Sequence, residues 1–305
     1  MRSNRTEVVL EPEIWRPRAQ AHRAAVDDLI GPYLQARRHG ARHPVIDFLF
    51  TYYSSRPAHL RRWHPGHGVG LRDAREYRSL PGYTVDDAIV AADPTHLADM
   101  RSALRRAHAI LTATAGRPVH LGCFGLHEWA MVYRTDRPRH DLPLRLGQAG
   151  TDTVVESMPL RCTHFDAFRF FTEAARPRNA TALSRDDQIA TEQPGCLHAS
   201  MDLYRACLRA APHLPSDLLL EAFRLALDAR ELDMRASPYD LTGLGYSAVP
   251  VETASGRAEY TREQSVIAER GTLLRARVLD GYRSLLSLQD SDDIDVTADH
   301  GVVGR

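Results

Sequence analysis

Residues 197–233 read LHASMDLYRACLRAAPHLPSDLLLEAFRLALDARELD, and this stretch decides the fold class. We predict two consecutive helices in it, over about 197–211 and 216–233. Ser216 and Asp217 open the second helix, as expected from residue types that favour helix N-termini. The stretch therefore predicts a body built mainly of helices.

The sequence on either side of this stretch extends the helical pattern. Asp93 and Pro94 supply a cap and a first-turn proline for a helix that ends at Gly116. We predict further helices over about 19–38, 119–135, 163–175 and 261–287. Strand-like pieces occur in LPLRLGQAGTDTVVESM (142–158), so the predicted fold is mainly α with a few short strands.

The chain has 305 residues and no linker rich in Pro, Gly or Ser that would divide it. We therefore predict a single globular helical domain over residues 1–288. Residues 289–305 are acidic and lack a packing pattern, which predicts a mobile tail.

Basic and acidic residues balance at 39 each, and the basic total is entirely Arg because the chain contains no Lys. Without a side-chain amine, pyridoxal phosphate enzymes, lysine-type aldolases and P-loop proteins are excluded. A net charge of zero provides no global field that would draw the protein onto nucleic acid.

No run approaches the ~18 apolar residues of a membrane span, and the N-terminus has no apolar signal core. We expect a cytoplasmic protein without a membrane partner.

Cysteine and histidine occur together at three places, as Cys123 with His127, Cys162 with His164, and Cys196 with His198. A spacing of four residues puts Cys123 and His127 on one helix face, and His198 and Asp202 share that spacing. Imidazole, thiolate and carboxylate groups are ligands of zinc and of non-haem iron. The pattern predicts a metal site at His127, His164 and His198, completed by carboxylates. The alternative is a set of buried thiols beside hydrogen-bonded histidines.

Acidic and arginine residues alternate in LDARELDMRASPYD (227–240) among apolar neighbours. An apolar setting raises the pKa of a carboxyl group towards the range useful for acid–base catalysis. This makes Asp228 and Asp233 candidate catalytic residues, and Glu128 is a third carboxylate in apolar surroundings. The alternative is an internal Arg–Asp network that closes a helix end.

Aromatic and basic residues are interleaved from Phe48 to His67. Aromatic faces beside guanidinium groups are what a protein uses to hold an unstacked base and its phosphates. The alternative is a set of core aromatic residues followed by a solvated basic turn.

Six stretches carry a resemblance to a known family: HPVIDFLFTYY (43–53), RWHPGHGVGL (62–71), FGLHEWAMVYR (124–134), GTDTVVESMPLRCTHFDAFRFF (150–171), RDDQIATEQPGCLHASMDLYR (185–205) and DMRASPYDL (233–241). Over about residues 10–270 the chain resembles a family of actinobacterial proteins labelled 3-methyladenine DNA glycosylase. The resemblance implies a hydrolase that removes alkylated purines from DNA, with DNA as partner and no required cofactor. A monofunctional glycosylase of this kind activates water with a carboxylate and needs no Lys.

Under this resemblance, candidate roles fall on residues that the patterns above single out. Asp233, Glu128 or Asp228 would activate water, and stacking on aromatic rings would hold the cationic base with a cation–π gain of about 1–2 kcal/mol. The candidate substrate-binding residues are Tyr53, Trp63, Trp129, Arg61, Arg62, Arg235 and Tyr239. Two other hypotheses stand beside this one. The first is a zinc- or iron-dependent enzyme acting on a small molecule, and the second is a non-catalytic protein that binds a nucleotide or a partner.

Overall fold

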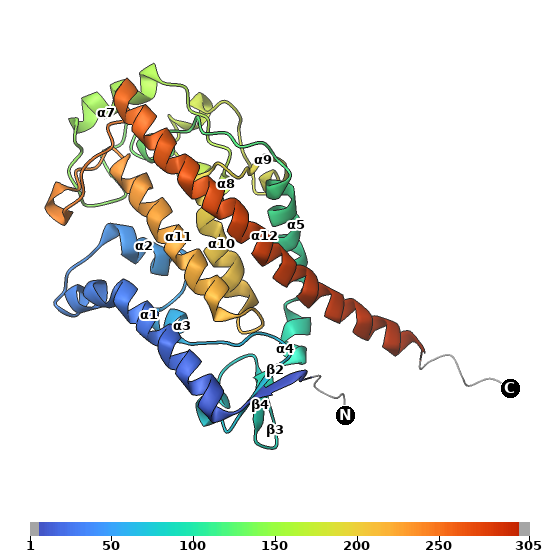
Figure 1. The fold of residues 1–305 in the computed structure, drawn as a ribbon. Coiled ribbons are helices and arrows are strands. Elements are labelled where there is room, and N and C mark those ends of the chain that lie inside the picture. The colour runs from blue at the N-terminus through green and yellow to red at the C-terminus, as the bar shows by residue number, and fades with distance from the viewer. Residues whose placement is uncertain (1–5, 299–305) are drawn as a thin grey trace.

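A computed structural model describes the backbone of residues 6–298 and the side chains of residues 6–288. The helices that carry the body are α5 (Arg101–Ala115), α10 (Leu197–Ala210), α11 (Ser216–Arg235) and α12 (Ala254–Ala298). Helix α10 packs along α11, and α12 lies across both of them and against α5 (Figure 1). The main hydrophobic core fills the space between these four helices. The predicted class, a mainly α domain with a few short strands, is confirmed.

The two helices predicted from residues 197–233 are both present. Apolar side chains on the two helices meet at their interface, where the rings of Tyr204 and Phe223 lie 5.1 Å apart. Helix α11 is enclosed on most of its surface, since Leu219, Phe223 and Leu232 are all buried. Its last turn therefore lies in a water-poor environment, and that turn carries Asp233.

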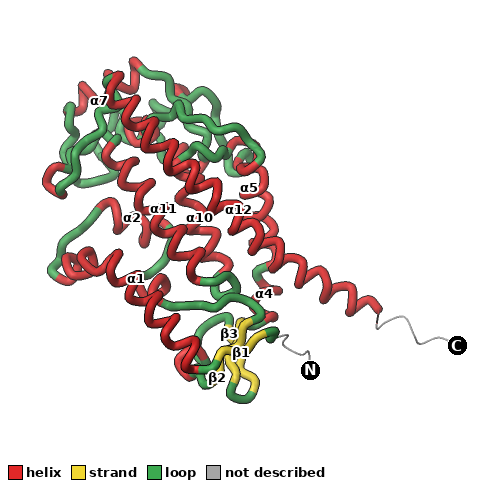
Figure 2. Tube along the Cα trace, viewed as in Figure 1, coloured by secondary structure: helices red, strands yellow, loops and turns green. Residues whose placement is uncertain are grey.

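Shorter helices complete the helical part of the described chain. They are α1 (Pro12–Arg38), α2 (Pro44–Tyr52), α3 (Pro57–Arg61), α4 (Pro94–Asp99), α6 (Leu126–Ala130), α7 (Gly147–Ser157), α8 (Phe165–Phe168) and α9 (Gln188–Thr191), with 3-10 turns at Arg75–Tyr77, Arg176–Arg178 and Thr242–Leu244. Asp93 caps α4 as predicted, because its side chain accepts a hydrogen bond from the backbone N–H of Thr95, but the helix predicted to run on to Gly116 is interrupted at Met100 and forms α4 and α5. A four-stranded sheet lies at the opposite end of the body from α7, α8 and α9 (Figure 2).

The sheet is formed by β1 (Val8–Leu10), β2 (Val69–Arg72), β3 (Tyr83–Asp86) and β4 (Ile89–Ala92), in the order β1-β2-β4-β3. Strands β1 and β2 are parallel, and the other pairs are antiparallel. A second hydrophobic cluster joins the sheet to α1 through Trp15, Trp63 and Tyr77. The strands thus cover one end of the molecule and take no part in the main core.

Several element predictions need correction. The strand-like pieces of residues 142–158 fold as α7, because Thr151, Val154 and Val155 have helical spacing and are buried together on one face. Of the helix predicted over 119–135, only α6 forms, and of that predicted over 163–175, only the single turn of α8. The last helix extends beyond the predicted 261–287 at both ends.

The tail predicted for residues 289–305 begins inside α12, whose backbone is helical to Ala298. Residues 299–305 and the side chains of 289–298 lie outside the described part, so the prediction of a mobile tail stays a prediction. Within the described residues, no helix combines the length and the apolar character that a membrane crossing requires.

Candidate metal centre

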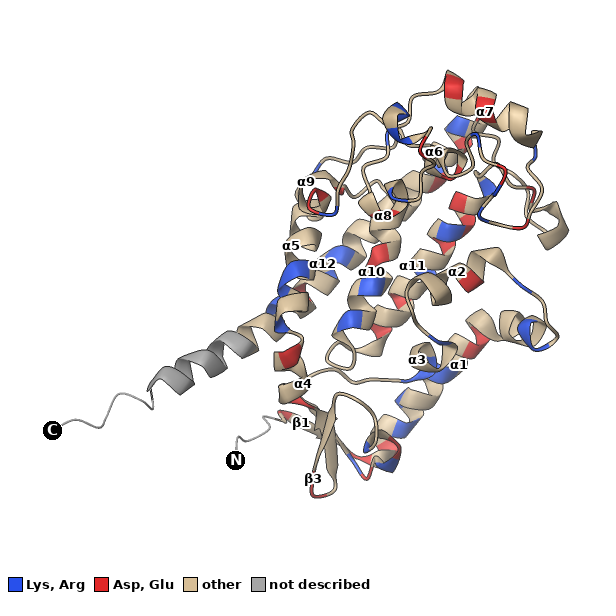
Figure 3. Cartoon of the chain, turned by 180° about the vertical axis from the view of Figure 1, so that it is seen from behind, with Lys and Arg blue, Asp and Glu red and all other residues tan. Residues whose placement is uncertain are grey.

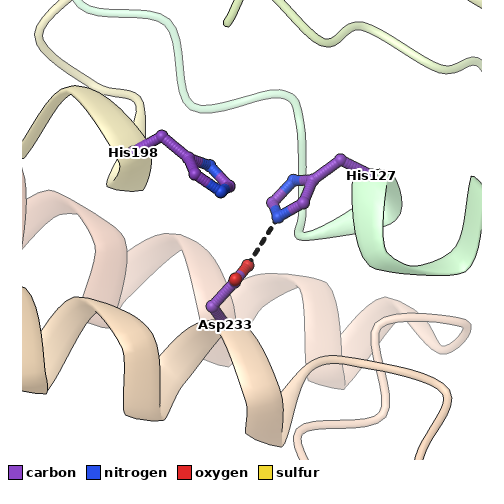
Figure 4. Close-up of side chains that lie close together, drawn as sticks. All are labelled: His127, His198 and Asp233. Carbon is purple, nitrogen blue, oxygen red and sulfur yellow. Dashed lines mark ion pairs between the residues drawn. The ribbon is translucent and has the colours of Figure 1, made fainter. Parts of the chain in front are cut away.

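Three helices that are distant in the sequence bring two histidines and a carboxylate together. His127 lies on α6, His198 in the first turn of α10 and Asp233 in the last turn of α11 (Figure 4). Each offers one potential ligand atom, and these atoms all lie within 4.8 Å of one another. The imidazole rings of His127 and His198 meet edge to face with centroids 4.6 Å apart. All three side chains are buried.

The local sequence around α6 explains how His127 reaches this position. Gly125 precedes α6 and has a φ of +70°, a left-handed conformation that favours glycine. A Cβ on Gly125 would also lie 3.2 Å from Cβ of Ala236, just after the end of α11. Glycine therefore allows the close approach of α6 to the end of α11. Trp129 holds α6 there by donating a hydrogen bond to the carbonyl oxygen of Ala236.

A buried ion network orients Asp233. Nη1 of Arg230 lies 2.8 Å from Oδ2 of Asp233 and 2.6 Å from Oε1 of Glu128. The guanidinium group also lies over the ring of Phe48, 4.1 Å from its centroid. Because Arg230 occupies Oδ2, the other carboxylate oxygen of Asp233 is left to face His127.

The contact between His127 and Asp233 is unusual in its geometry. Nε2 of His127 and Oδ1 of Asp233 lie 2.7 Å apart, the distance of an ion pair, but the ring N–H is poorly directed at the carboxylate oxygen and neither atom has another partner among the described residues. On the other side of the ring, Nδ1 of His127 lies 3.5 Å from Sγ of Cys123. The arrangement fixes the ring while Nε2 and Oδ1 stay without directed partners.

The two histidines have opposite electrostatic environments. Burial lowers the pKa of His127, but the nearby Asp233 outweighs it, so this pKa is raised well above its ordinary value. Burial and the neighbouring His127 hold the pKa of His198 well below its ordinary value. His198 is therefore neutral at pH 7, with a lone pair free for a ligand. Burial of Glu128 is outweighed by Arg230, which lowers the pKa of Glu128 to about 2.

His164, the third predicted ligand, lies beside this group and is not part of it. Its ring centroid is 5.2 Å from that of His198. Its Nε2 lies 3.5 Å from Oε1 of Glu192 and 3.4 Å from Oδ2 of Asp202. Asp202, which shares a helix face with His198, thus faces His164. The structure brings together two of the three predicted histidines and adds Asp233, which the sequence singled out as a catalytic carboxylate.

The other carboxylate and C-terminal candidates lie apart from this group. Asp228 is half-exposed and pairs with Arg270 on α12, with Nη1 2.7 Å from Oδ2. Arg235 points towards Glu259 and Glu263 of α12. Tyr239 is buried, and its hydroxyl accepts a hydrogen bond from the backbone of residue 140. None of these three residues belongs to the metal-ligand group. The predicted carboxylates that do lie there are Asp233 and, through Arg230, Glu128.

The aromatic candidates occupy separate places. Trp63, Arg61 and Arg62 line one cavity of about 310 Å³ between α1 and the 3-10 turn at Arg75–Tyr77. Trp129 is fully buried in the main core. Tyr53 packs against that core and donates a hydrogen bond to Asp202. The structure therefore brings Trp63 together with the two arginines and leaves the other two rings elsewhere.

A larger cavity adjoins the metal-ligand group. It has a volume of about 540 Å³, and Cys123 and Cys162 belong to its lining. Cys123 is the residue that contacts His127, so a single side chain separates this cavity from a candidate ligand. Arg117 and Arg161 provide charged groups in the same lining. The cavity has the size of a small-molecule pocket.

No family model, curated protein or solved structure matches the chain. The features of the molecule that bear on function are the geometry of His127, His198 and Asp233 and the cavity beside them.

Proposed function

We propose that the protein is a metal-dependent enzyme that acts on a small molecule, with one Zn²⁺ or Fe²⁺ ion bound by His127, His198 and Asp233. The observation that carries the proposal is the 2.7 Å separation of Nε2 of His127 and Oδ1 of Asp233, two buried atoms without directed hydrogen bonds. Two ligand atoms that each lie about 2.0–2.2 Å from one ion are about 2.8–3.6 Å apart at octahedral or tetrahedral angles, so Nε2 and Oδ1 would move apart by a few tenths of an ångström when the ion binds.

The number of ligands favours catalysis over a structural role. Structural zinc sites have four protein ligands, whereas catalytic sites have three and leave a position for water or substrate. Two histidines and one carboxylate are also the facial set of non-haem iron enzymes. Among the described residues, His127, His198 and Asp233 form a group of three side chains whose ligand atoms lie within 4.8 Å of one another. A divalent ion here would supply Lewis-acid chemistry or, as iron, oxygen chemistry.

The surrounding residues have defined roles in this proposal. Arg230 donates a hydrogen bond to Oδ2 of Asp233 and so orients the carboxylate with Oδ1 towards His127. Hydrogen bonds of this kind commonly orient metal ligands. Cys123 restrains the ring of His127 through Nδ1. His198 is neutral at pH 7, and His127 would release its proton when the ion binds. The substrate would bind in the cavity lined by Cys123 and Cys162.

Metal analysis tests the proposal directly. Protein purified without a chelator and without a metal-affinity tag is expected to hold about one equivalent of zinc or iron, and Asp233→Asn is expected to hold below about 0.1 equivalent. His22→Gln is the matched control, since His22 is also a buried histidine but its ring bonds to the carbonyl oxygen of Leu60, away from the metal-ligand group. Wild-type protein that holds below about 0.1 equivalent after supply of both metals would overturn the proposal.

The family resemblance makes a different prediction, the release of alkylated bases from DNA. That activity would need stacking rings beside a water-activating carboxylate, and the ring of Trp129 is fully buried, with its Nε1–H bonded to the carbonyl oxygen of Ala236. Base release is therefore measured on the same preparation, with and without chelator. Release by metal-free wild-type protein that Asp233→Asn abolishes would replace the metal proposal by the glycosylase one.

A further inference from the structure

A second, smaller cavity lies between α5, α10 and α12, next to α9. It has a volume of about 110 Å³, and its lining is unusually rich in arginine. Figure 3 shows blue, basic segments on α5, α10 and α12 where these helices run side by side. The arginines of the lining are Arg106, Arg185, Arg205, Arg209 and Arg275.

Arg275 is the buried member of this set. Its side chain is 1% exposed, and its single hydrogen bond runs from Nη2 to the carbonyl oxygen of Ala199, at 3.3 Å. Nε and Nη1 have no hydrogen-bond partner among the described residues, and no carboxylate there lies within ion-pair distance of the group. Burial lowers the pKa of Arg275 to about 10, so it is still a cation at pH 7. The carboxylate of Glu192 acts on this charge only from beyond ion-pair distance, and a buried cation without a directly paired counter-ion is strongly unfavourable.

The remaining arginines of the cavity divide into two groups. Arg185 and Arg205 both pair with Asp166, and Arg205 also lies over the rings of Tyr52 and Tyr53. Arg106 and Arg209 are exposed and have no carboxylate partner among the residues that the structure describes, although Nη2 of Arg106 reaches Oε1 of Gln188. Three guanidinium groups around this cavity are thus without a counter-charge of their own.

The acidic side chains of the lining do not remove this surplus. Glu192 accepts a hydrogen bond from Gln188 and faces His164, and burial raises its pKa. Asp202 accepts a hydrogen bond from Tyr53, and its other oxygen lies 3.5 Å from Arg205. Both carboxylates are thus directed at other partners, and neither forms an ion pair with Arg275.

We propose that this cavity is a binding site for one small tetrahedral oxyanion, either inorganic phosphate or the phosphate group of a larger ligand. Planar guanidinium forks match phosphate oxygens, and several converging arginines are the usual way to bind such a group. A volume of about 110 Å³ has room for a few water molecules or one such anion. The two unpartnered nitrogens of Arg275 would donate at the buried end, and Arg106 and Arg209 at the exposed one.

The anion site is close to the metal-ligand group but does not depend on it. Ala199, which accepts the hydrogen bond of Arg275, follows His198 directly on α10, and Asp202 is one turn further on. None of His127, His198 and Asp233 lines the arginine cavity. Phosphate is therefore expected to bind equally well to chelator-treated and to metal-loaded protein.

Calorimetric titration of the full chain with inorganic phosphate tests the inference. We expect one site in the wild type, and Arg275→Met is expected to weaken binding at least about tenfold, since it removes charge-assisted hydrogen bonds. Arg277→Met is the matched control, because Arg277 lies on the same helix but pairs with Glu221 on the surface. It is expected to leave the affinity for phosphate unchanged.

Thermal unfolding gives a second measurement that separates lost binding from lost folding. Without phosphate, Arg275→Met is expected to melt at or above the wild-type temperature, because an apolar chain replaces an uncompensated buried charge. With phosphate, the wild type is expected to rise in melting temperature and the variant to stay unchanged. Failure of phosphate to bind the wild type, equal binding by Arg275→Met, or equally tight binding of acetate would each overturn the inference. None of these outcomes bears on metal content.

Discussion

The replacement Arg230→Met examines the buried network that orients the candidate metal ligand Asp233. Methionine keeps an unbranched apolar stem but removes the guanidinium group, and with it both the positive charge and the contact over the ring of Phe48. The change leaves Glu128 and Asp233 as two buried carboxylates without their shared counter-ion. The free energy of unfolding is therefore expected to fall.

The geometry sets the size of this fall. The side chains of Arg230, Glu128 and Asp233 are all exposed by 5% or less, and the two contacts are 2.6 and 2.8 Å long. At an effective dielectric of about 20, two unit charges about 4 Å apart, roughly the separation of the guanidinium and carboxylate centres in such a contact, attract by about 4 kcal/mol before the desolvation of the charges is counted. Removing one partner of a buried pair costs about 3–5 kcal/mol, and we expect Arg230→Met to lie in this range.

Urea unfolding at pH 7 in the presence of a chelator measures the effect without a contribution from bound metal. The matched control is Arg270→Met, which breaks the 2.7 Å contact with Asp228. Both partners of that pair are about half-exposed, so the loss is expected to be at most about 1 kcal/mol. Arg230→Lys keeps the charge without the planar fork and is expected to lie between Arg230→Met and the wild type.

The comparison between the two methionine variants decides the matter. If Arg230→Met lowers the free energy of unfolding no more than Arg270→Met does, the buried ion pairs of Arg230 contribute no more to stability than the exposed pair of Arg270 and Asp228. The reasoning that Arg230 holds Asp233 in place would then be wrong.

Three further substitutions test stability. Gly31→Ala, inside α1 where a Cβ meets no atom within 4 Å apart from its chain neighbours, is expected to stabilise the protein by at most about 0.5–1 kcal/mol in urea unfolding, because Pro32 disfavours the helical conformation of a preceding residue with a Cβ. Gly256→Ala places a Cβ 2.0 Å from the backbone oxygen of Pro250 and is expected to cost about 1–3 kcal/mol in the same assay; equal effects would contradict this packing argument. Burial lowers the pKa of His213 from 6.5 to about 3, so below pH 6.5 the unfolded chain binds a proton that the folded chain does not. His213 is therefore expected to lower the free energy of unfolding by about 2 kcal/mol between pH 7 and pH 5. Urea unfolding at the two pH values measures this loss, and His213→Leu is expected to reduce it.

The helical body was predictable because its signals are local. Residues 197–233 carry the start signal of α11 and the apolar positions of two helices, and the structure has both helices within about two residues of the predicted ends. Helix α7 was misread as strand because Val154 and Val155 favour strands when considered by themselves. Their burial together with Thr151 on one helix face, a tertiary effect, decided otherwise.

The sequence by itself determined which chemical groups are available. The absence of Lys excludes amine chemistry, and the Cys–His pairs indicated imidazole ligands at residues 127, 164 and 198. The acidic stretch around Asp233 allowed both a catalytic group and an internal ion network. Such residue types can be recognised in a linear chain because their chemistry does not depend on the fold.

Only the tertiary structure decided which of these groups meet. His127 and Asp233 are separated by more than a hundred residues, and their contact depends on Gly125 allowing α6 to approach the end of α11. Asp233, rather than His164, joins the two histidines, because α10 and α11 pack with the start of one beside the end of the other. The unpartnered charge of Arg275 likewise arises from packing, since burial between helices removes both water and counter-ions from a residue that would otherwise be solvated.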